Sequence, residues 1–285
     1  MIRRAIVCAA TLLLLATSLF SLDLSLNVNF SNFDFARDRA VDATSLPPSD
    51  LMWSVGASGT QELAEDVFVD FAYRDDPVLR RQFFTRLQYT DEFFRFVFGP
   101  FFGLWNAPDT ILQSGLSTTV ELFVPGLITV ALRSDTSLSA RLVVPGDYIQ
   151  EQSELSLGFF VYNAIPRIYL RSKRYTYKTS LGERIDSLTE YGLRTDVFQK
   201  NIPYQLILDF GYQRGIKTFM EPTTVTHGFG ALTIATEVDA SLTDAFTIFA
   251  SLEGSIYTFG TDFLVGSVNS DQFMFRTTAG ARLQL

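Results

Sequence analysis

Nine arginines and five acidic residues lie on the polar side of stretches in which apolar and polar residues alternate. The arginines are Arg86, Arg95, Arg133, Arg141, Arg167, Arg171, Arg194, Arg276 and Arg282, and the acids are Asp70, Glu121, Asp209, Glu237 and Glu253. The rigid, planar guanidinium of arginine suits charge pairing in a confined space. If all these side chains share one interior, that interior is locally cationic and favours anionic or dipolar solutes.

The elements that carry these charges are amphipathic strands. The clearest is 273–285, where Phe273, Phe275 and Leu283 share one face and Arg276 and Arg282 share the other. A period of two kept over this length predicts a strand with one apolar and one polar face. The same pattern predicts fifteen segments, at 22–30, 51–58, 67–74, 80–90, 93–99, 116–124, 127–134, 138–144, 153–162, 166–177, 187–197, 204–212, 228–239, 246–257 and 273–285.

The direction of the two faces separates two kinds of barrel. A soluble barrel hides its apolar face and needs about eight strands, whereas a membrane barrel turns the apolar face to lipid and keeps a polar lumen. The strand number, the charges on the polar face and the tyrosines near strand ends favour the membrane barrel, and a sandwich or solenoid with a solvated face is the alternative.

The first residues have the composition of a secretory signal peptide. Arg3 and Arg4 precede an apolar run from Ala5 to Leu19, and small residues follow. We expect cleavage after Ser21, with Ser18 as the alternative, which leaves 22–285 as a single barrel domain. The whole chain has a net charge of −8, and removal of the two arginines leaves 21 basic against 31 acidic residues, or −10. This balance argues against nucleic acid as a partner.

Residue types that catalysis and metal binding require are scarce. Cys8 lies inside the expected signal peptide, and His227 is the one histidine. A single histidine cannot form a multi-histidine zinc site, and no serine beside it suggests a hydrolase pair. We therefore expect His227 to face solvent in an outer loop, and we expect no catalysis, no metal and no cofactor.

An aromatic segment, Phe98-Gly99-Pro100-Phe101-Phe102-Gly103-Leu104-Trp105, is unusual for a connection between strands. Because proline cannot donate to a sheet ladder, Pro100 assigns this segment to a loop. Phe101, Phe102 and Trp105 would then lie at the membrane interface or fold inward as a plug.

The leader, the alternating strands and the apolar C-terminal Leu283-Gln284-Leu285 resemble those of bacterial outer-membrane β-barrel proteins, over essentially all of 22–285. The resemblance implies an antiparallel up-and-down barrel in the lipid bilayer of the outer membrane, with an even strand number. Fifteen segments therefore contain one error, which loop lengths place between 93 and 165, and we expect 14 strands, with 12 or 16 as neighbours. It also implies recognition of the last strand by the barrel-assembly machinery, although the class usually ends in Phe and this chain has Leu285.

Two functions fit these residues. One is a passive channel for small hydrophilic solutes with an arginine-rich lumen. The other is a non-conducting surface barrel, sealed by pairing of the same charges, whose loops bind a partner or which has a structural role. The motifs are generic and select no narrower family.

Overall fold

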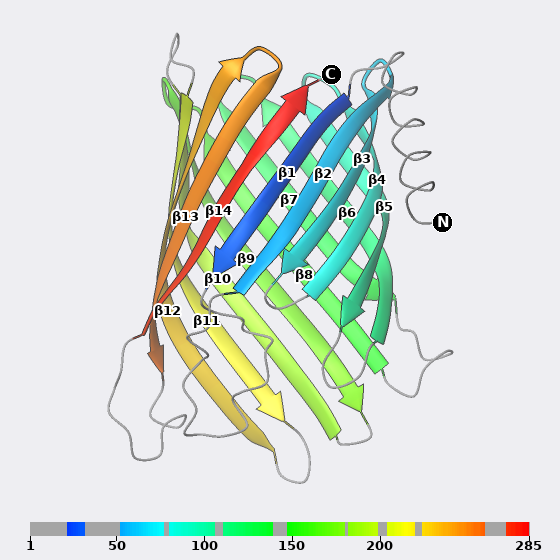
Figure 1. The fold of residues 1–285 in the computed structure, drawn as a ribbon, viewed down its shortest axis with the longest axis vertical. Coiled ribbons are helices and arrows are strands. Elements are labelled where there is room, and N and C mark those ends of the chain that lie inside the picture. Colours follow the sequence, from blue (N-terminus) through cyan, green and yellow to red (C-terminus); the bar gives the residue numbers. More distant parts are fainter. Residues whose placement is uncertain are drawn as a thin grey trace.

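A computed structural model describes residues 22–31, 52–76, 80–105, 111–138, 147–179, 182–198, 204–219, 224–259 and 272–284. It contains fourteen strands (Figure 1). They are β1 (Leu22–Ser31), β2 (Met52–Ala64), β3 (Val67–Asp76), β4 (Arg80–Thr90), β5 (Phe94–Trp105), β6 (Ile111–Val124), β7 (Ile128–Leu138), β8 (Asp147–Phe159), β9 (Ala164–Thr179), β10 (Gly182–Phe198), β11 (Tyr204–Phe219), β12 (Val225–Thr243), β13 (Phe246–Phe259) and β14 (Gln272–Gln284).

The fourteen strands form one closed antiparallel barrel. Each strand pairs with its sequence neighbour, and β1 pairs with β14 from Asp23–Gln284 to Ser31–Arg276. Closure gives every strand two partners, so no edge keeps unpaired backbone groups that lipid could not satisfy. Among the described residues, no helix is long and apolar enough to cross a membrane.

The strand number predicted from the sequence is confirmed. β7 ends at Leu138 and pairs directly with β8, which begins at Asp147, so the closed barrel leaves no place between them for the predicted segment 138–144. Residues 139–146, which include Arg141, lie outside the described part of the chain. The expected signal peptide, 1–21, lies outside it too.

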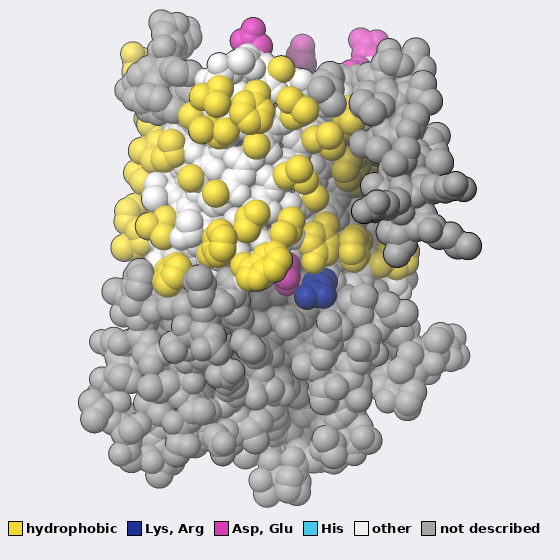
Figure 2. Space-filling view, viewed as in Figure 1, with side chains coloured by type: hydrophobic (Ala, Val, Ile, Leu, Met, Phe, Trp, Pro, Cys, Tyr) yellow, Lys and Arg dark blue, Asp and Glu magenta, His cyan; other side chains and the backbone are white. Residues whose placement is uncertain are grey.

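The outer face of the barrel is apolar. Large side chains such as Trp53 (71% exposed), Leu26 (62%) and Leu232 (62%) point away from the lumen. Figure 2 shows apolar side chains over the described wall, with acidic groups at one rim. Outward rings also pair across strands, as in Tyr191–Tyr212, whose centroids lie 5.6 Å apart. Exposure of so many large apolar groups suits contact with lipid, and the architecture is that of a bacterial outer-membrane barrel.

Short turns join the strands at the end of the barrel where β1 begins and β14 ends (Figure 1). Between β6 and β7, the Leu127 amide donates to the Val124 carbonyl at 2.9 Å. Gly126 has a φ of +71°, so Val124-Pro125-Gly126-Leu127 is a type II turn that needs glycine at its third position.

The barrel wall is taller on one side. β9, β10, β11 and β12 have 16, 17, 16 and 19 residues, and they project beyond their neighbours at the end opposite the short turns (Figure 1). The predicted segments 166–177, 187–197, 204–212 and 228–239 are therefore too short, because hairpin pairing continues to Thr179 and Gly182 and to Phe219 and Val225. His227 accordingly lies in β12, opposite Lys217, and not in a loop.

The aromatic segment near Pro100 belongs to β5, so the assignment to a loop and the prediction of a plug are wrong, whereas a position at the membrane interface stays a prediction. β5 pairs with β6 without a break, including Pro100 with Leu116. Pairing with β4 skips the residues opposite Gly99 and Pro100. The missing N–H thus interrupts one ladder only, and the other keeps the strand in place.

Aromatic side chains inside the barrel lie flat over glycines of the next strand. A Cβ atom at Gly115 would lie 2.4 Å from the Phe101 ring, and one at Gly280 would lie 2.4 Å from the Phe249 ring. Phe101 is fully buried, whereas Phe102 faces outward. Glycine therefore makes room for these rings against the wall.

Candidate functional site

A cavity of about 280 Å³ lies inside the barrel against strands β3 to β10. Six arginines line it, and three carboxylates accompany them. The arginines are Arg86, Arg95, Arg133, Arg167, Arg171 and Arg194, and the carboxylates are those of Asp70, Glu121 and Glu154. The remaining lining residues are Val97, Thr119, Ala131, Ser156 and Tyr169.

The register of the strands creates these charge pairs. Arg86 lies directly opposite Asp70 in the β3–β4 ladder, and Arg95 lies opposite Glu121 in the β5–β6 ladder. Directly opposite residues on one face of a sheet have neighbouring Cβ atoms. Their side chains meet accordingly, at 2.6 Å between Arg86 and Asp70 and at 3.1 Å between Arg95 and Glu121.

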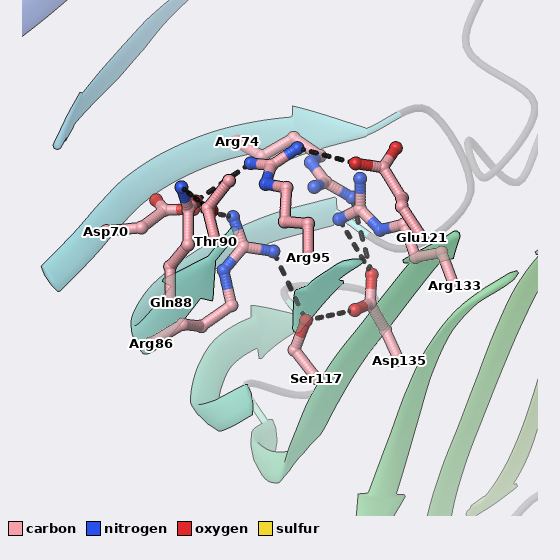
Figure 3. A network of polar contacts seen from close by, with 10 residues as sticks. All are labelled: Asp70, Arg74, Arg86, Gln88, Thr90, Arg95, Ser117, Glu121, Arg133 and Asp135. Atoms are coloured by element: carbon pink, nitrogen blue, oxygen red, sulfur yellow. Dashed lines mark hydrogen bonds and ion pairs between the residues drawn. The ribbon is translucent and has the colours of Figure 1, made fainter. Parts of the chain in front are cut away.

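One polar network connects β3 to β7 (Figure 3). Asp135 is its centre, because this fully buried carboxylate accepts hydrogen bonds from Ser117 and from Arg133. Arg74 approaches the same oxygen at 3.6 Å. Arg86 extends the chain by donating to Ser117 at 3.2 Å. A buried carboxylate with several donors holds these guanidiniums in fixed positions.

Two further clusters of charged residues lie on β8 to β11. Asp196 receives Arg167 at 2.8 Å and Arg194 at 3.1 Å, one on each carboxylate oxygen. Arg171 donates to Glu154 at 2.9 Å. It also lies within 4.0 Å of two more carboxylates, those of Glu190 and Asp209.

Tyr169 belongs to the cluster around Arg171. Its hydroxyl lies 2.9 Å from a Glu190 oxygen and 2.7 Å from an Asp209 oxygen. A phenol has a single proton, so it donates to one of these groups at a time. The Arg171 guanidinium stacks on the ring at 4.2 Å from its centroid, and cation–π contact of this kind adds to the hold on Arg171.

Neutral amide and hydroxyl groups gather near the closure of the barrel, between the charged positions of β14. On β1, the Asn29 amide donates to Asn27 at 3.2 Å and to the Ser54 hydroxyl of β2 at 3.3 Å. Thr278 of β14 donates to Asn29 at 2.8 Å. Neutral groups on β1 and its two neighbouring strands thus lie beside a lumen wall that is charged elsewhere, including at Arg276 and Arg282 of β14.

The remaining two predicted arginines lie outside the cavity. Arg282 pairs with Asp239 and with Glu237. Arg276 lies directly opposite Glu253 in the β13–β14 ladder. Arg141 is outside the described residues, and nothing is described of the Trp105 side chain at the end of β5.

Arginines reach further into the lumen than most of the acids that hold them. Arg167 and Arg194 are 33% and 32% exposed, whereas the Asp196 side chain between them is 8% exposed. Arg133 is 27% exposed, and Asp135 is not exposed at all. Because an arginine side chain is longer than an aspartate side chain, the acids lie recessed in the wall and the guanidiniums face the water.

Sequence reasoning missed the acids that balance the arginines. The structure adds five carboxylates to the lumen side, those of Asp135, Glu154, Glu190, Asp196 and Asp239. The ratio of nine arginines to five acids is therefore wrong. A signal was available, because Asp135, Asp196 and Asp239 each lie two residues after a charged residue already assigned to the polar face.

Within the described ranges, no group of three or more His, Cys, Asp and Glu residues is placed so that it could bind a metal ion. His227 contributes a strand position only, since nothing is described of its side chain.

Several solved outer-membrane barrels have a similar structure. In-vitro folded OmpT of Vibrio cholerae matches with a TM-score of 0.48 and 8% identity, over 93% of this chain and 96% of that chain. An anion-selective porin from Comamonas acidovorans matches with 0.42 and 11%, over 93% and 98%. The outer membrane channel DcaP of Acinetobacter baumannii matches with 0.36 and 10%, over 93% and 96%. No protein-family model and no curated protein matches the chain.

Proposed function

We propose that this protein is a passive outer-membrane channel for small hydrophilic solutes, with a mild preference for anionic or dipolar ones. The observation that carries the proposal is the recession of the acids behind the arginines in a closed barrel. A solute passing the cavity meets guanidinium groups first, although the described lumen contains many carboxylates. Charged rings placed in this way select permeating ions by sign.

The two-sided lumen supports the preference for dipolar solutes. The six arginines of the cavity lie on β4 to β10, whereas the neutral groups of Asn27, Asn29 and Thr278 lie on β1 and β14. A field across the lumen orients a solute with an anionic end and a neutral polar end. Both ends then find hydrogen-bonding partners.

Reversal potentials of purified protein in planar bilayers under a salt gradient test this proposal. We expect permeability to chloride to exceed permeability to potassium. Arg95→Gln should reduce the ratio of chloride to potassium permeability, because Arg95 lines the cavity. Arg174→Gln should leave this ratio unchanged, because Arg174 is exposed on the outward face of β9. Clear cation selectivity of the wild-type protein would refute the proposal.

A non-conducting barrel is the second candidate, and the charge networks favour it. Arg86, Arg95 and Arg171 each contact acids on neighbouring strands, and pairing of this kind can close a lumen. Liposome swelling separates the two functions, since swelling in sugars or amino acids requires an open path.

The proposal includes export and assembly. We infer that residues 1–21 are removed as a signal peptide and that β14 is recognised by the barrel-assembly machinery. N-terminal sequencing of protein from outer-membrane fractions tests the cleavage site. Deletion of 273–285 should leave the chain unassembled and degraded.

A further inference from the structure

Two arginines face each other across the β9–β10 ladder inside the cavity. Arg167 and Arg194 are directly opposite in the register, and both line the cavity. Like charges in directly opposite positions destabilise a sheet. The pair therefore needs a group that holds it together.

Asp196 contacts both arginines from the wall side of the cavity. Its two carboxylate oxygens receive Nη1 of Arg167 at 2.8 Å and Nε of Arg194 at 3.1 Å. Asp196 is buried and is not part of the cavity lining. The negative charge is thus on the wall side of the pair, and the guanidiniums are on the lumen side.

Gly158 makes room for one member of the pair. A Cβ atom at Gly158 would lie 2.8 Å from Cγ of Arg167 and 2.7 Å from the methyl group of Thr129. Only glycine lets the Arg167 side chain rest against β8 at this point. The position of Arg167 is therefore set by packing as well as by charge.

Unused donors remain on both arginines. A guanidinium has five N–H groups, and Asp196 engages one nitrogen of each residue. Within the described part of the chain, neither arginine contacts another carboxylate at salt-bridge distance. Both arginines line the cavity, so their other N–H groups border its interior.

We propose that Arg167 and Arg194 form a binding subsite for an oxyanion, meaning a carboxylate, phosphate or sulfate group. Two adjacent planar forks match a group with several oxygens, since each fork can donate two parallel hydrogen bonds. A halide ion has one centre and cannot use both forks in this way. The inference deepens the proposed channel function and rests on it for the electrical measurement below.

Block of chloride current by inorganic phosphate tests the subsite. We expect phosphate to reduce the chloride current of the wild-type channel, and Arg167→Gln and Arg194→Gln each to weaken the block by about tenfold or more. Arg282→Gln removes the same charge outside the cavity and should leave the block unchanged. Equal block in all four proteins, or an equal loss in Arg282→Gln, would overturn the inference.

Two further variants separate geometry from charge. Arg167→Lys keeps the charge and removes the fork, so phosphate block should weaken while chloride selectivity stays. Asp196→Asn makes the lumen more positive but releases the pair, so chloride selectivity should rise while phosphate block weakens. A stronger phosphate block in Asp196→Asn would show that net charge alone attracts the anion, and the subsite would be refuted.

The remaining measurements compare different oxyanions and test binding in a barrel that does not conduct. Acetate, sulfate and phosphate at equal ionic strength show which oxyanion binds best, and an unchanged chloride current with all three would contradict the subsite. If the wild-type barrel does not conduct, the channel function fails. Calorimetric titration of the detergent-solubilised protein with phosphate then tests the subsite alone, and the same loss in Arg167→Gln and Arg194→Gln would support it, whereas no loss would overturn it.

Discussion

Replacement of Asp135 by asparagine removes the charge at the centre of the β3–β7 network while its shape is kept. The aspartate is fully buried and accepts hydrogen bonds from Ser117 and Arg133, with Arg74 at 3.6 Å. In the variant, the new amide N–H₂ group faces donors where an acceptor is required. Two guanidiniums then lose their common counter-charge.

The expected loss of stability follows from these contacts. A hydrogen bond to a charged group contributes about 1.5 to 3 kcal/mol and a neutral one about 1 kcal/mol, and the Arg74 contact at 3.6 Å adds little. Arg74 and Arg133 are about a quarter exposed, so water replaces part of the loss. We therefore expect Asp135→Asn to lower the free energy of unfolding by about 2 to 3 kcal/mol.

Urea-dependent folding into lipid vesicles, followed by tryptophan fluorescence and by heat-modifiable gel migration, measures this change. With a slope of about 2 kcal/mol per molar urea, the midpoint should fall by about 1 M. Glu151→Gln is the matched control, because Glu151 is exposed on the neighbouring strand β8. If the two variants unfold at the same urea concentration, Asp135 does not hold the network and the reasoning fails.

Three further changes test the wall itself, each by the same unfolding assay. Gly115→Ala should cost about 1 to 3 kcal/mol, because its Cβ would lie 2.4 Å from the Phe101 ring and from a backbone oxygen; an unchanged midpoint would show that the ring can move freely. Tyr169→Phe should cost about 1 kcal/mol, through loss of the hydroxyl contacts to two carboxylates, and no loss would mean that Arg171 alone neutralises them. Leu132→Arg should lower the free energy of unfolding by about 2 to 4 kcal/mol, because it places a charge on the lipid-facing side, whereas the neighbouring Arg133 faces the lumen. A smaller loss than that caused by Leu132→Ala would contradict the assignment of faces.

The fold was largely predictable because its signal is local. In β14, the alternation from Phe273 to Leu283 assigns each side chain to a face without any knowledge of neighbouring strands. The same holds for most of the barrel, so most strands and the inward arginines followed from the pattern, and the even strand number of such barrels reduced fifteen segments to fourteen. Prediction failed where a local rule competes with pairing. Pro100 suggested a loop, but the ladder with β6 kept it in β5.

The partners of the arginines were not predictable in the same way. Asp196 lies two residues after Arg194, and the sequence therefore places both on one face. Its contact with Arg167 depends on the register between β9 and β10, and a shift of one residue would turn the whole face outward. The buried position of Asp135 depends in turn on three strands that meet only in the closed barrel.

The sequence by itself thus determined that the chain forms amphipathic strands with arginines on the polar face, because side-chain alternation is a property of each strand alone. The tertiary structure decided which charges meet and which of them reach the lumen. The physical reason is that register and side-chain length act between strands: they bring Asp196 behind Arg167 and Arg194, and they turn a lumen rich in acids into a cavity lined by guanidiniums.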